Sequence, residues 1–177
     1  MMNAATGRPP LILRRLAAPD AACYRELRLE GLRRHPEAFS SSWEDESSRS
    51  LDWFAGRLEG NAVFGANSAV DPTLAGVVGL HVPEAVKLRH KGALWGMFVQ
   101  PEYQGTGLGM ALVAHVIEYA AQVVEEVRLT VVASNTAAIR LYTRAGFEQY
   151  GLERRALKVG EHYHDELLMT LQLGCPS

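Results

Sequence analysis

Residues 100–109 read QPEYQGTGLG, and this glycine-rich segment could bind an anion. An apolar run over residues 94–99 leads into it and an apolar-periodic run over residues 108–119 leads out, which predicts a strand, a turn and a helix in succession. The first backbone N–H groups of a helix lack partners and lie at the positive end of its dipole. The segment is therefore a candidate site for a phosphate or pyrophosphate.

Two familiar phosphate-binding loops do not fit the spacing of these glycines. A P-loop requires a lysine directly after its last glycine, and none follows here; a dinucleotide fingerprint requires a third glycine where the chain has Met110. The pattern that fits is Gln/Arg-x-x-Gly-x-Gly, formed by Gln104, Gly107 and Gly109. Taken alone, the segment could also be a turn that binds no ligand.

A second segment, residues 135–147, reads NTAAIRLYTRAGF and predicts a short helix. Asn135 suits the N-cap and Gly146 suits the C-terminal stop. Tyr142 lies seven residues after Asn135, so the two side chains should share one face of the helix. An ordinary capped helix with a tyrosine in the core is the alternative that this segment leaves open.

The two segments, in this order, resemble the acetyl-coenzyme A motifs of the GNAT superfamily of N-acetyltransferases. The first is similar to the loop that binds the pyrophosphate, and the second, N-x-x-A-x-x-L-Y-x-[RK]-x-G-F, to the family's second coenzyme A motif. The resemblance covers roughly residues 10–173 and is strongest over residues 94–147.

The resemblance implies a fold of the α/β (α+β) class, with a mixed, partly splayed sheet and helices on both faces. The pattern of the residues predicts the same order of elements. The expected strands cover residues 11–16, 62–66, 74–82, 93–99, 126–132, a short stretch from 147, and 166–173; the expected helices cover 20–34, 51–60, 107–121 and 135–145. Residues 40–50 should form a loop, and Asp71 and Pro72 should form a turn.

By this resemblance the chain is an acyltransferase that moves an acetyl group from acetyl-coenzyme A to a primary amine by direct attack. A non-catalytic acyl-coenzyme A-binding or regulatory domain of the same fold is the alternative. Tyr142 is the expected catalytic residue, placed to protonate the leaving thiolate. The residues expected to bind acetyl-coenzyme A are Met97, Phe98, Val99, Gln104, Gly105, Thr106, Gly107, Leu108, Gly109, Asn135 and Tyr142.

The general base is not identified by the sequence. Many relatives carry an acidic residue on the strand before the glycine turn, and residues 93–99 contain none. The candidates are Glu44, Glu46, His81, Asp165 and Glu166. Gly96 interrupts the same strand and predicts either a bulge, whose neighbouring N–H would polarise the thioester carbonyl, or merely a weak strand position.

Bulk properties limit the remaining possibilities. A length of 177 residues suits a single domain over residues 10–177, after a disordered tail of residues 1–9. The net charge of −2 disfavours a nucleic-acid partner. No run is long and apolar enough to cross a membrane, and two widely separated cysteines suit the cytoplasm. No metal site is expected. We expect a homodimer that forms through an exposed edge strand at residues 166–173.

The acceptor itself cannot be read from the sequence beyond a primary amine on a small molecule or peptide. We expect it to approach between residues 39–46 and 161–165, because acidic side chains in and beside both segments would attract a cationic amine.

Overall fold

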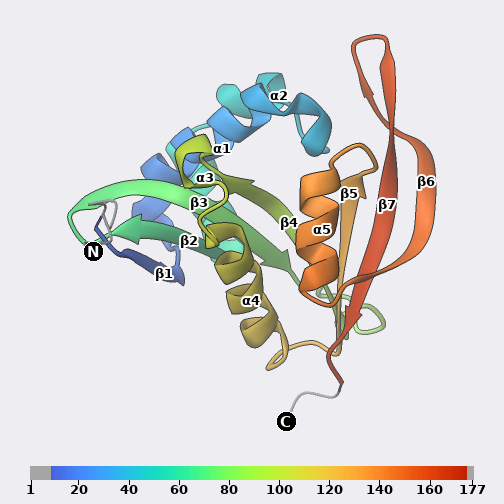
Figure 1. The fold of residues 1–177 in the computed structure, drawn as a ribbon. Coiled ribbons are helices and arrows are strands. Elements are labelled where there is room, and N and C mark those ends of the chain that lie inside the picture. Colours follow the sequence, from blue (N-terminus) through green and yellow to red (C-terminus); the bar gives the residue numbers. More distant parts are fainter. Residues whose placement is uncertain (1–8, 175–177) are drawn as a thin grey trace, which may run out of the picture.

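A computed structural model describes residues 9–174 of the chain. The expected tail lies outside the described residues except for Pro9, and Cys175 lies outside them as well. The described residues form a single mixed sheet of seven strands in the order β1-β2-β3-β4-β5-β7-β6, flanked by helices (Figure 1). The strands are β1 (Leu11–Arg15), β2 (Ala62–Ser68), β3 (Asp71–His81), β4 (Lys91–Val99), β5 (Glu126–Val132), β6 (Glu148–Val159) and β7 (His162–Gln172). The α-helices are α1 (Ala21–Arg34), α2 (Trp43–Ser47), α3 (Leu51–Gly60), α4 (Leu108–Ala120) and α5 (Thr136–Arg144).

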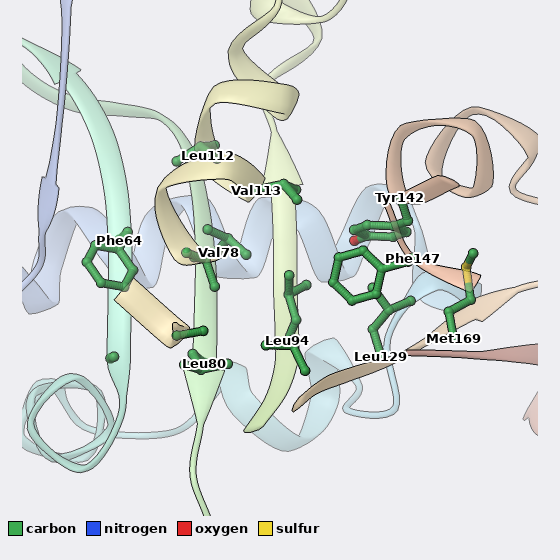
Figure 2. Packing of buried hydrophobic residues seen from close by; sticks show 14 of the residues in the cluster. Phe64, Val78, Leu80, Leu94, Leu112, Val113, Leu129, Tyr142, Phe147 and Met169 are labelled. Carbon is green, nitrogen blue, oxygen red and sulfur yellow. The ribbon is translucent and has the colours of Figure 1, made fainter. Parts of the chain in front are cut away.

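The helices cover both faces of the sheet, as expected for this fold class (Figure 1). Neighbouring residues of a strand point to opposite faces, so Val77 packs in the cluster beneath α1 and α3 while Val78 packs in the cluster beneath α4 and α5. Figure 2 shows part of the second cluster, in which Val113 of α4 and Tyr142 of α5 lie over the strands.

The centre of the sheet opens between β4 and β5. These two strands are parallel, as predicted, but their ladder contains only the pairs Lys91–Glu126, Gly92–Val127 and Ala93–Arg128. Beyond this point β4 continues against β3 and β5 continues against β7. The two strands therefore diverge, and each leaves unpaired backbone on the side that faces the gap.

Residues 40–50 are not the continuous loop that the sequence predicts, because they contain α2. The hydroxyl of Ser42 caps this helix by accepting a hydrogen bond from the backbone N–H of Asp45 at 3.1 Å. A helix of five residues is too short to give a clear apolar period, so the pattern did not reveal it.

The turn between β2 and β3 also differs from the prediction. It lies at residues 69 and 70, while Asp71 and Pro72 belong to β3. Pro72 has no partner in the β2–β3 register, which is irregular at this point, and a residue without an N–H is tolerated in such a position.

The C-terminal strands are longer than predicted and are arranged differently. β7 pairs with β5 on one side and with β6 on the other, so residues 166–173 do not form the edge of the sheet. The expectation of an exposed apolar edge strand there was wrong. The edge is β6, whose Glu153, Arg154, Arg155 and Lys158 are charged, and charges on an edge oppose strand-to-strand association.

Candidate active site

The glycine turn joins β4 to α4 and presents an open backbone surface. Gly105 and Gly107 have φ angles of 72° and 92°, a region that side chains other than glycine adopt at a cost. A Cβ atom added at either glycine would meet nothing within 4 Å. In the described part of the chain, the backbone N–H groups of residues 105–110 donate no hydrogen bond. The turn is thus a set of free donors at a helix N-terminus, and it fits a pyrophosphate.

Two side chains that the sequence assigns to cofactor binding hold this turn in shape. Gln104 Nε2 donates a hydrogen bond to the carbonyl of Val99 at 3.1 Å, and Thr106 Oγ1 donates to the carbonyl of Tyr103 at 2.6 Å. Leu108 is buried in the core beneath α4. The Leu108 side chain is therefore not available to a ligand, and the side chains of Gln104 and Thr106 are each tied to the turn by one hydrogen bond.

The end of β4 contains the bulge that Gly96 predicts. Val77 pairs with Phe98 and Gly79 with Trp95, so Gly96 and Met97 together oppose the single residue Val78. Gly96 has a φ angle of 64°, which again favours glycine.

The strand and the glycine turn meet at Met97 and Gly109, where the Met97 side chain lies 3.6 Å from the position of a Cβ on Gly109. Phe98 points to the other face of the sheet and is buried beneath α1. Of the predicted cofactor residues of β4, Met97 therefore lies beside the start of α4, whereas the Phe98 side chain lies on the opposite face of the sheet.

The second motif forms α5 as predicted. Asn135 Oδ1 caps the helix by accepting a hydrogen bond from the N–H of Ala138 at 3.1 Å. Tyr142 is 6% exposed, and its ring packs edge-on against Phe147 with 5.8 Å between ring centroids. Figure 2 shows its hydroxyl directed toward β4 and α4. Burial raises the pKa of the Tyr142 phenol above its usual value, so the group is a neutral hydrogen-bond donor at physiological pH.

A cavity of about 400 Å³ lies where β4 and β5 diverge. Its lining comes from seven separate segments of the chain. The lining residues are Arg28, Ala38, Phe39, Ser40, Ser41, Arg57, Asn61, His81, Ala93, Leu94, Trp95, Gly96, Thr130 and Glu166. The bulged part of β4 thus forms one wall of the cavity.

The structure separates the candidates for the general base. Glu44, Glu46 and Asp165 do not line the cavity, whereas His81 and Glu166 do. The N–H of Arg155 donates a hydrogen bond to Asp165 at 2.8 Å.

Glu46 is unsuited to proton transfer because two arginines bind it. Arg28 donates two hydrogen bonds to its carboxylate, at 2.8 and 2.9 Å, and Arg57 donates a third at 2.9 Å. Burial alone would raise the pKa of Glu46, but the hydrogen bonds and charges of these arginines outweigh it and hold the pKa below its usual value.

Glu166 has the opposite environment. It lies on β7 opposite Val132 and Glu153, and only 9% of its surface is exposed. Burial, followed by the nearby charge of Glu153, raises the pKa of its carboxyl group, and a hydrogen bond from Thr130 opposes this only in part. A carboxylate with a raised pKa is a better proton acceptor near neutral pH.

Sequence reasoning missed the two arginines of this site, Arg28 and Arg57, of which Arg28 is buried. Arg28 is 4% exposed and lies on the same face of α1 as the buried residues Tyr24, Leu27 and Leu32. A charged residue at an inward position of a helix was the signal that could have revealed it.

The comparisons with known proteins agree with this geometry. The sequence profile of the Acetyltransferase (GNAT) family matches residues 29–147. The chain belongs to this family. Within the GNAT family, the chain is 36% identical over 85 residues to the [ribosomal protein bS18]-alanine N-acetyltransferase of Escherichia coli K12. The match spans 48% of this chain and 57% of that relative, little more than half of its length.

Solved structures share the fold over nearly the whole length of this chain. A GNAT-family acetyltransferase from Streptococcus pneumoniae has a TM-score of 0.82 and 25% identity, and the match covers 93% of this chain and all of that one (100%). A structure from Salmonella typhimurium, solved with its cofactor acetyl-CoA, has a TM-score of 0.77 and 20% identity, with 95% and 96% covered. This second likeness shows the fold alone.

Two further findings concern residues 9–174. No group of three or more His, Cys, Asp or Glu side chains in this part of the chain could hold a metal ion. None of its helices is long and apolar enough to cross a membrane.

Proposed function

We propose that this protein is an N-acetyltransferase that moves an acetyl group from acetyl-coenzyme A to a primary amine of a small molecule or peptide. The observation that carries the proposal is the opening between β4 and β5, which has the free N–H groups of the glycine turn beside it and the cavity with Glu166 within it. A solved structure of the same fold contains acetyl-CoA, and a curated relative acetylates an alanine of a ribosomal protein. Location in the cytoplasm and assembly as a homodimer belong to the same proposal.

Each group has one task in this reaction. Acetyl-coenzyme A supplies the thioester, and residues 105–110 hold its pyrophosphate while the backbone of residues 97–99 lies beside its pantetheine arm. The N–H groups next to the Gly96 bulge polarise the thioester carbonyl.

Glu166 takes one proton from the acceptor ammonium, since an amine with a pKa near ~10 is almost wholly protonated at neutral pH. The neutral amine then attacks the carbonyl carbon, a C–N bond forms and the C–S bond breaks. As the amide forms, the nitrogen loses its second proton to solvent, and solvent protonates the leaving thiolate, to whose sulfur the Tyr142 hydroxyl donates a hydrogen bond.

The test is release of free thiol from acetyl-coenzyme A in the presence of a panel of amines. We expect release that depends on both the amine and its concentration. Calorimetric binding of acetyl-coenzyme A without any amine-dependent release would favour the non-catalytic, acyl-coenzyme A-binding alternative.

A further inference from the structure

The cavity at the opening of the sheet has walls of opposite charge. On the side of α1 and α3, two guanidinium groups, Arg28 and Arg57, share the single carboxylate of Glu46, so one positive charge is not compensated within the cluster. On the side of β7, Glu166 carries the negative charge. Thus the expectation that the acidic segment of residues 44–46 attracts a cation is wrong at Glu46, whose charge the arginines neutralise.

Arg57 is the more exposed of the two arginines that line the cavity. The Arg28 side chain is 4% exposed and uses Nε and Nη2 to bind Glu46, whereas the Arg57 side chain is 21% exposed and binds Glu46 through Nη1 alone. Among the described residues, none accepts a hydrogen bond from Nε or Nη2 of Arg57. A guanidinium with unused N–H groups in a partly desolvated cavity is best matched by a carboxylate or another oxyanion.

Aromatic contacts fix the position of this guanidinium. Its central carbon lies 4.5 Å from the ring centroid of Trp95 on β4 and 5.1 Å from that of Trp53 on α3. Trp95 lines the cavity beside Gly96, so Arg57 is held over the wall that contains the bulge. A preorganised cation of this kind binds an anion with little loss of side-chain entropy.

We propose that the acceptor is a small molecule that carries both a primary amine and an anionic group, with its ammonium at Glu166 and its anion at Arg57. A free amino acid is the simplest member of this class. The inference rests on the proposed function and narrows its acceptor. A polyamine would instead bring a second positive charge toward Arg57, and the end of a peptide chain would leave that guanidinium without a partner.

The experiment compares amino acids with their carboxamides, which keep the amine and lose the negative charge. Each is assayed with the unmodified protein, with Arg57→Gln and with Arg49→Gln as the matched control. Arg49 also stacks on Trp53, at 5.5 Å, but does not line the cavity. Binding of the same compounds to the protein saturated with coenzyme A is measured by calorimetry, which is independent of turnover.

We expect kcat/KM to favour the amino acid over its amide by tenfold or more. Arg57→Gln should abolish this preference, because it should raise the KM and the Kd of the amino acid and change those of the amide by no more than about twofold. Arg49→Gln should keep the preference. Arg57→Lys, which retains the positive charge, provides a second variant if Arg57→Gln does not fold, and it should keep part of the preference.

Three results would overturn the inference: equal kcat/KM for amino acid and amide, a preference for peptides over amino acids, or a preference that survives in Arg57→Gln. If no amino acid binds the coenzyme A complex, the inference also fails. Failure of the proposed function has a different signature, in which acetyl-coenzyme A binds and no amine of either kind releases thiol.

Discussion

At the scale of single residues, Tyr142 is buried where a phenol can donate a hydrogen bond but gives up its proton with difficulty. An ordinary phenol has a pKa near 10 and a thiol one near 8.5, so full transfer is already uphill by about 2 kcal/mol. Burial raises the pKa of Tyr142 and makes the transfer less favourable still. We infer that Tyr142 acts mainly by donating a hydrogen bond to the developing thiolate.

The corresponding prediction is that Tyr142→Phe lowers kcat by about 100-fold or more while the Kd of acetyl-coenzyme A changes less than about threefold. Steady-state kinetics and calorimetry on the same samples provide both values. A kcat within a factor of about two of the unmodified protein would mean that Tyr142 serves only as a packing residue of the core.

The raised pKa of Glu166 leads to a prediction of how the reaction depends on pH. Its pKa is raised, so as the pH falls the carboxylate becomes protonated earlier than an ordinary glutamate and loses its capacity to accept a proton. We expect kcat/KM to fall on the acidic side with an apparent pKa above the usual value of about 4.3. Glu166→Gln should lower kcat/KM by about 100-fold and remove this acidic limb.

The control for Glu166 is Glu161→Gln at the exposed tip of the β6–β7 hairpin, which should leave the pH profile unchanged. An acidic limb that persists in Glu166→Gln would assign the proton acceptor to another group, and His81 is the other candidate that lines the cavity.

At the scale of elements, the turn between β4 and α4 provides a test with an internal control. Gly107 and Gly160 both have positive φ angles, 92° and 58°, and both face open space where a Cβ would be added. Gly107→Val and Gly160→Val both place a side chain at a positive φ angle, with the greater strain at Gly107, but only the first obstructs the proposed pyrophosphate site.

We predict that Gly107→Val weakens binding of acetyl-coenzyme A at least tenfold, about 1.4 kcal/mol, and that Gly160→Val does not. Thermal unfolding of both variants establishes that they are folded. Unchanged affinity in a folded Gly107→Val protein would place the pyrophosphate elsewhere.

The short parallel ladder of β4 and β5 is held at its start by Glu126. Its carboxylate accepts hydrogen bonds from Arg128 and, at 2.8 Å, from Thr170 on β7. The bond from Arg128 is the largest cause that lowers the pKa of Glu126 from 4.5 to about 2. A carboxyl group with a lowered pKa in the folded state stabilises the protein above pH ~4.5, and this contribution disappears as the pH falls toward 2.

Glu126→Gln should therefore lower the free energy of unfolding by about 1 kcal/mol at pH 7, a reduced value because Arg128 is partly exposed to solvent. The difference from the unmodified protein should shrink as the pH falls from 5 toward 2. Urea unfolding over this range measures it, with the exposed neighbour Glu125→Gln as control. A difference that does not vary with pH would mean that the loss arises from packing.

Regular elements were predictable from the sequence where local signals agreed. The helix after Asn135 and the helix after Ser50 begin at capping side chains and were placed within a residue or two. The five-residue α2 and the full length of β6 were not, because a very short helix has no period and β6 is stabilised by its pairing with β7 rather than by its own pattern.

At the scale of the whole molecule, the cofactor-binding segments of the site were predictable from the sequence, and its cavity was not. The glycine turn and α5 are contiguous segments, so a motif could reveal them. The cavity could not be read in this way, because Arg28, Arg57, Trp95 and Glu166 come together only through the order of strands and the divergence of β4 from β5. The sequence left five candidates for the general base, and only two of them, His81 and Glu166, line the cavity.

The homodimer remains a prediction with a different structural basis. Because β7 is internal, we place the proposed dimer contact at the hairpin of β6 and β7, where Tyr150, Leu152 and Tyr163 are exposed. Sedimentation at micromolar concentration should give twice the chain mass of 19.4 kDa, and Leu152→Glu should shift it to the monomer. A single species near 19.4 kDa for the unmodified protein would refute the dimer.

The most direct test of the proposed reaction is the balance between thiol and product. Acetyl-coenzyme A with an isotopically labelled acetyl group is incubated with the protein and an amino acid, and free coenzyme A and acetylated amine are measured together by mass spectrometry. We expect one labelled N-acetyl product for each thiol released, at a rate that falls about 100-fold in Tyr142→Phe. Thiol release without an acetylated amine, or formation of the product at an unchanged rate in Tyr142→Phe, would contradict acetyl transfer at the opening between β4 and β5.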